Sequence, residues 1–447
     1  MRSESFKEKS YWLSSGDHAV GRLLQGDLSV DVAVIGGGYT GLSTAYHLKT
    51  AEPGVSIVLL EGQVIGYGGS GRNAGFSNTL FGVSLGLTAL RFGKTNAKEA
   101  HQYMEQAVDT TRELVTTLGI DCDYEHPGFF LLATSPAYEK KIKHELEFAL
   151  SLGIDGIEWL ERDEVQLQVQ SPLIRGAWWQ PRCGLLNPAK LCWGWKRVLE
   201  SLDVAIYENS PVTEIQPRDR HIRLQTPNGT VDAQKVVLAT NAYSHLLPRL
   251  RWKQAPAWTH IVLTEPLTNE QLAAIGWQNR QGLEDARNLA HYFRLTADNR
   301  LLMGGRDITL GYGADMDRDR NDTTFAGLEQ NVVEMFPSLR GVRFTHQWGG
   351  PVSLTLDMVP AVGYLGDKRM MYSLGYTGHG VSTGHMNGRL LADLLRDRQT
   401  GLSDLFFVNR TVLPLPPDPL RWLGIAAVRG FLRWQDRRND PKSHQGS

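Results

Sequence analysis

The stretch from Val30 to Gly41 constrains the fold more than any other part of the chain. A short apolar run meets three glycines with the spacing G-x-G-x-x-G, namely Gly36, Gly38 and Gly41. This pattern predicts a strand, a tight turn and a helix whose first N–H groups face a pyrophosphate. Tyr39 and Thr40, which lie between Gly38 and Gly41, join the glycines as candidate ligand contacts.

The residues after this motif supply its context. Leu42 to Lys49 has a helical pattern, and the apolar run Ser56 to Leu60 ends in Glu61. A βαβ unit places an acid roughly 20 residues after the glycines, against a ribose hydroxyl. The motif therefore predicts a dinucleotide site. The alternative is a glycine-rich turn between core elements.

Composition excludes several classes of protein. The chain has 447 residues and a formal net charge of −1, which fits two domains and gives no electrostatic footprint for nucleic acid. Its three cysteines have no metal-ligand spacing and suit a reducing compartment. No metal site, secretory segment or transmembrane helix is expected, and we predict a cytoplasmic protein.

A second glycine-rich stretch, Gly66 to Gly75, has the composition of a ligand-binding loop. Such a loop exposes backbone N–H groups and lets a ligand approach closely. Its nearness to Glu61 favours ligand binding over the alternative of a mobile surface linker. The candidate contacts in this loop are Gly69, Ser70, Gly71, Arg72 and Asn73.

The middle of the chain alternates helical and strand patterns. Helices are predicted at 97–118, 138–152, 188–202 and 323–336, and strands at 128–133, 204–207, 212–215 and 257–264. One hairpin is predicted across Asn228-Gly229 and another through Asp298-Asn299. The apolar run 236–239 ends in Thr240 and Asn241, as expected for a parallel strand whose end faces a ligand.

A second strand, glycine turn and helix follow near the C-terminus. The strand is Met370 to Leu374, the turn spans 375–381, and the helix runs from Ser382 to Arg396. The turn lacks the G-x-G-x-x-G spacing. We therefore expect the helix start, with its partial positive charge, to meet the same ligand from the other end.

The tail from Asp418 to Arg438 has an amphipathic pattern. Leu420, Leu423, Ala427, Phe431 and Trp434 recur at helical spacing, with several arginines among them. Such a helix can pack on its own protein or on a partner, or it can rest weakly on a membrane surface.

These blocks together resemble the D-amino-acid oxidase-like family of FAD-dependent oxidoreductases, in particular its γ-glutamylputrescine oxidase-like and glycine or sarcosine oxidase-like branch. The resemblance covers nearly the whole chain. It rests on the order and spacing of 34–41, Glu61, 69–73, 239–242, Trp348-Gly349-Gly350 with Asp357 and Pro360, and 375–381.

The resemblance implies an α/β fold with a Rossmann-like FAD-binding domain and a substrate domain on a mixed, largely antiparallel sheet. The FAD domain would comprise residues 1–97, 175–250 and 345–415, and the substrate domain 98–174 and 251–344, with 416–447 as a C-terminal helix and tail. It also implies that Val212 contacts adenine through its backbone and that Gly378, His379, Gly380 and Val381 meet the flavin. No Cys or His clearly matches a covalent attachment site, so we expect non-covalent FAD.

A single nucleotide motif argues that the electrons come from the substrate, a small amine or amino acid oxidised at its C–N bond. Candidate substrate-site residues are His260, Tyr292, Arg294, Trp348 and Tyr376, each of which could instead be a core or surface residue. The alternatives are an NAD(P)H-dependent flavin monooxygenase and a non-catalytic flavin-bound subunit. The sequence leaves the electron acceptor and the oligomeric state open.

Overall fold

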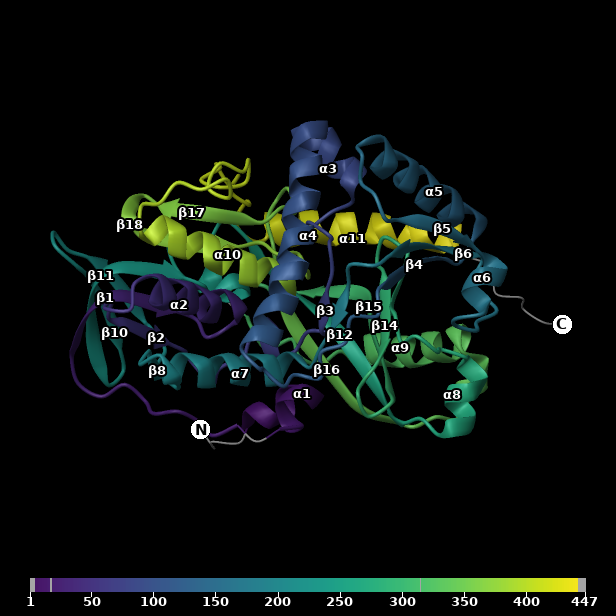
Figure 1. Ribbon diagram of the computed structural model, residues 1–447, viewed down its shortest axis with the longest axis horizontal. Coiled ribbons are helices and arrows are strands. Elements are labelled where there is room, and N and C mark those ends of the chain that lie inside the picture. Colours follow the sequence, from purple (N-terminus) through teal and green to yellow (C-terminus); the bar gives the residue numbers. More distant parts are fainter. Residues whose placement is uncertain (1–4, 17, 314, 441–447) are drawn as a thin grey trace.

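The fold is α/β, as predicted, and is built around two eight-stranded sheets. The computed structural model describes residues 5–16, 18–313 and 315–440, so residues 1–4 and 441–447 of the predicted end segments lie outside the described residues. Figure 1 shows the sheets in two halves of the molecule, with helix α4 (Lys94–Thr117) crossing the junction.

The first sheet contains the predicted βαβ unit. Its central strands run parallel and are buried on both faces. In spatial order they are β17 (Ala361–Leu365), β18 (Asp367–Leu374), β11 (Gly229–Leu238), β1 (Leu28–Ile35), β2 (Ile57–Leu60) and β8 (Ala205–Tyr207), with β10 (Ile222–Thr226) and β9 (Glu214–Pro217) attached to β11. Helices α2 (Tyr39–Ala51), α7 (Pro188–Ser201) and α10 (Gly380–Leu395) lie beside this sheet.

The second sheet is mixed and largely antiparallel, as expected. Only the pair β13–β4 is parallel among its described strands. The order is β16 (Phe344–Leu354), β12 (Ala255–Pro266), β15 (Arg300–Leu310), β14 (His291–Leu295), β13 (Gly282–Asp285), β4 (Phe129–Ala133), β6 (Gly176–Gln180) and β5 (Glu158–Glu161). Helix α9 (Asp322–Met335) packs on one face and α5 (Pro136–Ser151) on the other.

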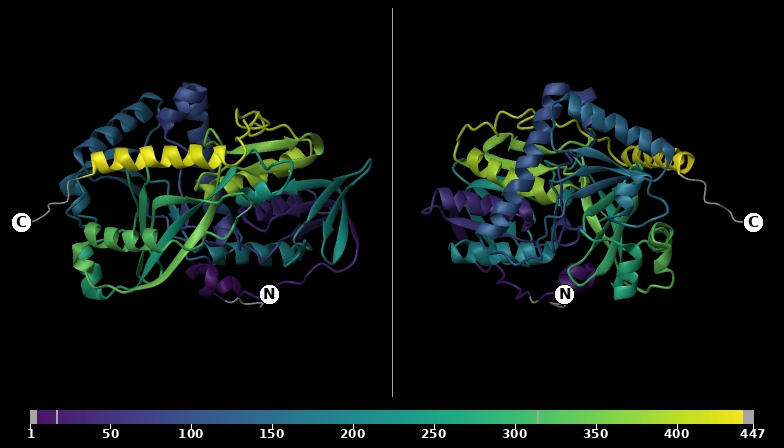
Figure 2. Two further views of the ribbon diagram at one scale, coloured as in Figure 1. Left: turned by 180° about the vertical axis from the view of Figure 1, so that it is seen from behind. Right: turned by 45° about the vertical axis from the view of Figure 1, so that its right-hand side comes forward.

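The remaining elements complete the described chain. These are α1 (Tyr11–Ser14), α3 (Leu85–Phe92), α6 (Arg162–Gln166), α8 (Asn269–Ile275), α11 (Leu420–Asn439), the 3-10 turns η1 (Ser5–Lys9), η2 (Gly69–Gly71), η3 (Asn241–Leu246) and η4 (Pro337–Leu339), and a small pair of strands, β3 (Phe76–Ser77) and β7 (Gly184–Leu185). Figure 2 shows α11 lying along the outside of the second half of the molecule.

Three details differ from the sequence prediction. Strands β6 and β16 hydrogen-bond into the second sheet, although the expected boundaries put them in the first domain, and α4 packs on α10 in the core of the first half. The first hairpin turns at Pro227 and Asn228, because Gly229 already pairs with Thr226. Strand pairing and helix packing join segments across the molecule, so spacing along the chain does not reveal them.

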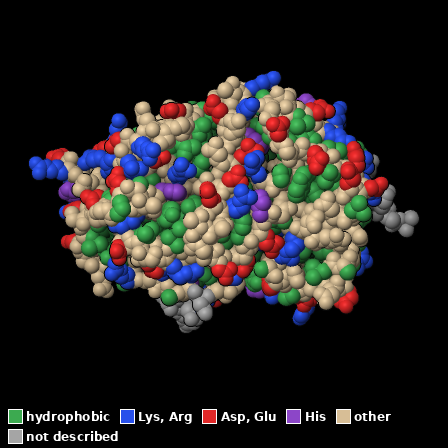
Figure 3. Space-filling view, viewed as in Figure 1, with side chains coloured by type: hydrophobic (Ala, Val, Ile, Leu, Met, Phe, Trp, Pro, Cys, Tyr) green, Lys and Arg blue, Asp and Glu red, His purple; other side chains and the backbone are tan. Residues whose placement is uncertain are grey.

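Charges of both signs are spread over the face seen in Figure 3. Basic and acidic side chains alternate there without a stretch dominated by one sign. This mixture agrees with the formal net charge of −1. No helix in the described part of the chain is long and apolar enough to cross a membrane.

Glu208 anchors the N-terminal arm to the first sheet. The arm buries Trp12 and Leu13. The fully buried Glu208 carboxylate pairs with His18 Nε2 at 2.8 Å and Lys196 Nζ at 2.9 Å, and it accepts a hydrogen bond from the Ile65 N–H. Burial alone would raise the pKa of Glu208, but these partners outweigh it and lower the pKa to about 2.

We predict that Glu208→Gln lowers the free energy of unfolding by about 3 kcal/mol at pH 7, because it leaves buried cationic partners uncompensated. The group's pKa is lower in the folded chain, so its contribution is full above its ordinary pKa of 4.5 and is lost as pH falls toward 2. Urea unfolding at several pH values measures this.

The matched control is Glu52→Gln, since Glu52 is half-exposed and pairs with Arg396 at the surface. Its effect should stay below about 1 kcal/mol. Equal losses in the two variants, or a Glu208→Gln effect that does not shrink in acid, would contradict the assigned role of Glu208.

Candidate active site

Two helices from distant parts of the chain begin at one edge of the first sheet. Helix α10 packs along α2, and a Cβ on Gly384 would lie 3.1 Å from Tyr39 Cβ, while one on Gly388 would lie 2.5 Å from Ser43 Cβ. Both helices run in the same direction, so α10 begins about 6 Å beyond the start of α2. Neither N-cap residue, Gly38 or His379, caps its helix with a side chain. Both helix starts therefore leave N–H groups free for a ligand.

The first glycine turn has the geometry that its spacing predicts. Gly36 has φ +110°, and a Cβ there would lie 2.6 Å from the Ala239 carbonyl oxygen. A Cβ on Gly41 would lie 2.0 Å from the Gly36 carbonyl oxygen. At Gly38, the only atoms within 4 Å of a Cβ belong to the Ser70 side chain. Gly36 and Gly41 thus serve the turn, and Gly38 allows the loop residue Ser70 to approach, since a Cβ there would lie 2.7 Å from Ser70 Oγ.

Glu61 lies at the end of β2, on the same edge of the first sheet as the start of α2. Its carboxylate accepts hydrogen bonds from Gly37 N at 2.7 Å and Gln63 N at 2.9 Å. Burial raises the pKa of Glu61, although the hydrogen bonds to the backbone oppose the rise. The Ser210 N–H donates to the Glu61 carbonyl, which brings the segment containing Val212 beside it. The two residues expected at the adenosine end therefore lie together.

The loop 69–73 lies next to the start of α2 and is held by its own side chains. Ser70 Oγ accepts a hydrogen bond from Tyr39 N at 3.2 Å, and Asn73 Nδ2 donates to the Gly69 carbonyl. Buried Arg72 donates to the Tyr67 carbonyl and pairs with Asp319 at 2.7 Å. Its guanidinium braces the loop, while the backbone of the loop stays beside the turn.

The end of β11 completes the edge. Thr240 Oγ1 bonds to Ser244 Oγ at 2.8 Å. Asn241 has φ +36°, and its buried Oδ1 has no hydrogen-bond partner among the described residues. A buried amide oxygen without a partner is costly, so it marks a place where a bound group can donate.

The second glycine turn is open. Gly378 is exposed, and a Cβ there would meet no atom within 4 Å. Burial lowers the pKa of the neighbouring His379 to about 4, so its imidazole is neutral at pH 7. An elongated cradle thus runs from Glu61 past Gly38 to Gly378, with two uncapped helix starts and an unpartnered amide oxygen. These residues fit a dinucleotide such as FAD.

Among the five candidate substrate-site residues, Tyr292 alone is partly exposed to solvent, and the other four are buried. Most of the Tyr292 side chain is nevertheless surrounded by protein. Arg294 Nη1 donates to the Ala74, Gly75 and Leu186 carbonyls. Trp348 Nε1 donates to the Arg72 carbonyl at 2.8 Å. Tyr376 bonds to Thr40 Oγ1 at 2.6 Å and to Ser373 Oγ. These three buried side chains hold the cradle together.

His260 does not join the site. It is fully buried, Nε2 lies 3.2 Å from the Arg318 carbonyl, and its ring packs edge-on against Phe325 of α9. This is the face of the sheet opposite to Tyr292, because side chains alternate between the faces of a strand. The sequence prediction for His260 is therefore wrong, since it could not fix which face of β12 the residue occupies.

The structure adds a row of residues that sequence reasoning missed. Register places Gly304, Tyr292, Glu284 and Leu131 beside one another on consecutive strands. The Tyr292 ring lies over Gly304, where a Cβ would clash with it, and reaches Thr259 of β12. Thr259, Tyr292, Glu284 and Leu131 all retain partial exposure. From this shared partial exposure on one face of the sheet we infer a cleft, with these four side chains as its floor.

This floor starts beside the cradle. Thr259 pairs with Gly350 of β16, and a Cβ on Gly350 would lie 3.3 Å from Arg72 Cβ. Phe76, three residues after the 69–73 loop, packs edge-on against Tyr292 with ring centres 6.1 Å apart. No sequence signal identifies Glu284, since β13 has four residues and carries no motif. The described residues contain no cluster suited to a metal ion, and all three cysteines are buried and free.

Comparisons with known proteins agree with this geometry. Residues 31–394 match the DAO family, described as FAD dependent oxidoreductase. The chain is 34% identical over 410 residues to γ-glutamylputrescine oxidoreductase of Escherichia coli, covering 91% of this chain and 92% of that protein. It is 26% identical over 376 residues to glycine oxidase of Bacillus licheniformis, covering 82% and 92%.

Solved structures share the fold. Glycine oxidase from Geobacillus kaustophilus superposes with a TM-score of 0.73 at 20% identity, covering 86% of this chain and all of that one. L-proline dehydrogenase from P. horikoshii gives a TM-score of 0.69 at 20% identity, covering 85% and 96%. With a family match across most of its length and a cradle that suits the dinucleotide, this chain belongs to the DAO family of FAD-dependent oxidoreductases.

Proposed function

We propose that this enzyme oxidises an amine or an amino acid at its C–N bond. The observation that carries the proposal is the cleft floor with Tyr292, which begins directly beside the FAD cradle. The named activities of the relatives, γ-glutamylputrescine oxidoreductase and glycine oxidase, support the same class of substrate. A γ-glutamylated diamine is the first compound to test, given the 34% identity.

Bound FAD would supply a two-electron acceptor for the hydride of the C–H next to the substrate nitrogen, and water would hydrolyse the resulting imine to a carbonyl compound and ammonia or an amine. We assign the predicted cofactor contacts to this cradle, with Gly36, Gly38 and Gly41 at the pyrophosphate and Glu61 at the ribose. The N–H groups of 378–381 and the dipole of α10 would stabilise the negative charge that develops on the flavin when it is reduced. Removing one such preorganised donor typically raises the activation free energy by about 3 kcal/mol.

Tyr292 is the side chain best placed to orient the substrate. Burial raises the pKa of Tyr292 to about 12, so its hydroxyl remains protonated and can donate a hydrogen bond at neutral pH. No strong base is needed, because the reacting amine has only to be in its neutral form. The free, buried cysteines support the proposal of a cytoplasmic location.

We predict that a suitable amine bleaches the flavin absorption of the purified protein under anaerobic conditions, whereas NADPH does not. The panel contains γ-glutamylputrescine, diamines, N-methyl amino acids and glycine-like acids. Reduction by NADPH with no amine active would favour a flavin monooxygenase. A flavin that resists the whole panel and also fails to react with sulfite would favour a non-catalytic subunit.

We further predict that the FAD is held non-covalently. His379 is the imidazole next to the flavin end of the cradle, and all three cysteines are buried and free, with Cys192 packed against Gly66 behind the cradle. Acid precipitation should leave all the flavin in the supernatant, measured by its absorbance. A yellow pellet would overturn this prediction, and His379 would then be the first residue to test as the attachment site.

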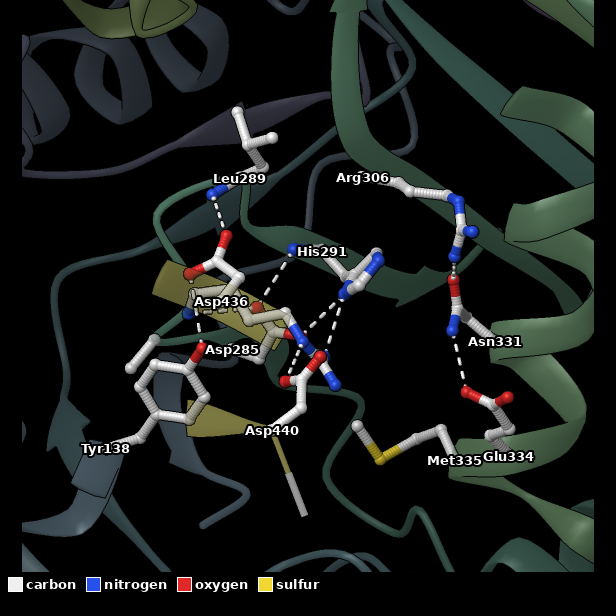
Figure 4. A network of polar contacts seen from close by, with 12 residues as sticks. Tyr138, Asp285, Leu289, His291, Arg306, Asn331, Glu334, Met335, Asp436 and Asp440 are labelled. Carbon is white, nitrogen blue, oxygen red and sulfur yellow. Dashed lines mark hydrogen bonds and ion pairs between the residues drawn. The ribbon is translucent and has the colours of Figure 1, made fainter. Parts of the chain in front are cut away.

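A second proposal concerns the C-terminal helix, which is docked with its polar face inward. Asp436 accepts hydrogen bonds from Asn288 N at 2.9 Å, Leu289 N at 3.0 Å and Tyr138 Oη at 3.2 Å (Figure 4). Arg429 pairs with Asp307 at 2.7 Å, and Arg433 also pairs with this carboxylate. The protein therefore holds α11 by ion pairs and hydrogen bonds.

The apolar stripe of α11 consequently faces outward. Leu420, Leu423, Phe431 and Trp434 are each more than half exposed, between 52% and 62%. Trp252 lies close by, since its carbonyl accepts a hydrogen bond from Leu415 N, and it is 40% exposed. Contiguous exposed apolar side chains on a folded protein mark an interaction surface.

We propose that this outward stripe of α11 rests on an anionic membrane surface. Trp434 in this stripe suits the headgroup layer, and the exposed Arg437 and Arg438 match its negative charge. The helix lies flat along the molecule, so the whole stripe can touch one plane (Figure 2). A quinone dissolved in that membrane would then be within reach as the electron acceptor.

We predict that the full-length holoenzyme floats with vesicles containing phosphatidylglycerol and that Leu423→Glu with Phe431→Glu reduces flotation at least five-fold. Leu90→Glu, at a residue that is 82% exposed on α3, adds a charge outside the stripe and should not change it. Binding that persists in the double variant would refute the proposal, as would a wild-type dimer that the double variant dissociates without any vesicle binding.

A further inference from the structure

Glu284 occupies the middle of the cleft floor and has no assigned partner. It lies between Tyr292 on β14 and Leu131 on β4, and its neighbours along β13, Leu283 and Asp285, point to the opposite face. The side chain retains partial exposure although it is deeply set. It therefore faces the space above the sheet and not the packed core.

Among the described residues, the groups that act on the Glu284 carboxylate are Asp285 and Lys141, and neither forms a hydrogen bond or ion pair with it. The nearest cation, Lys141 of α5, donates to the Ala286 carbonyl at 2.9 Å. Asp285, on the other face, is satisfied by His291 and Arg287. An acid that is deeply set, reachable from the cleft and unpaired by the protein is suited to an external cation.

Resting on the proposed amine oxidation, we propose that Glu284 binds a second, non-reacting ammonium group of the substrate. A carboxylate stabilises the protonated form of a nitrogen that it contacts. The nitrogen that undergoes oxidation must be neutral, because its lone pair assists loss of the hydride. The nitrogen at Glu284 is therefore a different one, and the substrate class is one with two basic nitrogens.

The spacing of the strands sets the distance between the two nitrogens. Thr259 lies beside the cradle, and Glu284 is three strands farther along the sheet. Strands are about 4.8 Å apart, so the two positions are about 14 Å apart. The surface between Thr259 and Glu284, and just beyond Glu284, is largely apolar and is formed by Phe76, Tyr292 and Leu131. This geometry selects an extended chain with one ammonium at its distal end.

The protonation state of Glu284 provides a second way to detect binding of an ammonium group at this subsite. Burial, together with repulsion from Asp285, raises the pKa of Glu284 to about 8, and Lys141 opposes the rise. The other titratable groups around it are Tyr292 and Cys183, whose pKa values burial also raises, so both stay neutral at pH 7. Without ligand, Glu284 carries a proton at pH 7, and binding of an ammonium releases that proton to solvent.

The experiment compares α,ω-diamines of four to ten carbons with the matching monoamines on the FAD-loaded enzyme. Anaerobic stopped-flow reduction gives the Kd and the limiting reduction rate for each compound. We expect the wild type to bind one intermediate or long diamine at least 10-fold more tightly than its monoamine, with proton release near pH 7. Glu284→Gln should abolish this preference and the proton release and leave the limiting rate within three-fold.

Controls separate this inference from the proposed function. Glu284→Asp should retain part of the preference, and Glu214→Gln, at an exposed position on β9, should retain all of it. If no amine reduces the flavin, the proposed function fails, and diamine-induced shifts of the oxidised flavin spectrum still test Glu284. Equal affinity for diamines and monoamines in the wild type, or a preference that survives in Glu284→Gln, overturns the assignment.

Discussion

The close contact between α2 and α10 is the constraint on which the site depends. Small residues at the contact, Gly384 and Gly388 against Tyr39 and Ser43, allow the two helices to pack nearly backbone to backbone. The hydrogen bond between Thr40 Oγ1 and Tyr376 Oη and the one that Ser43 Oγ donates to the His385 carbonyl then fix how far the two helices are displaced along each other. Two partial positive charges are thereby brought to one edge of the sheet, which an anionic, elongated cofactor can neutralise.

The same constraint explains why several predicted substrate-site residues have another role. Tyr376, Trp348 and Arg294 direct their polar atoms to Thr40, to the Arg72 carbonyl and to the carbonyls of 74–75. They satisfy backbone and hydroxyl groups that would otherwise be buried without partners. The cradle is held rigid by these bonds, so the residues left free to meet a substrate are fewer and lie on the neighbouring sheet.

Helix α11 shows how a correct local prediction can leave the outcome open. Its pattern of apolar residues is confirmed as a helix over Leu420–Asn439. An apolar stripe usually turns inward, whereas here Asp307 and the amides of 288–289 attract the charged face. Which face is buried depends on partners contributed by β15 and by the loop before β14, and the helix sequence contains no information about them.

The sequence by itself determined the nucleotide half of the protein. The spacing of Gly36, Gly38 and Gly41, the acid at Glu61 and the glycine turn at 375–381 are patterns along the chain, so they can be recognised without knowing which remote segments pack against them. The substrate half was decided only by tertiary structure. Whether His260, Tyr292 or Glu284 faces the cleft depends on strand register and on which sheet face meets the cradle, and a shift of one residue reverses every side chain. Pairing between strands that are remote in sequence sets that register, so it can be determined only once the chain has folded.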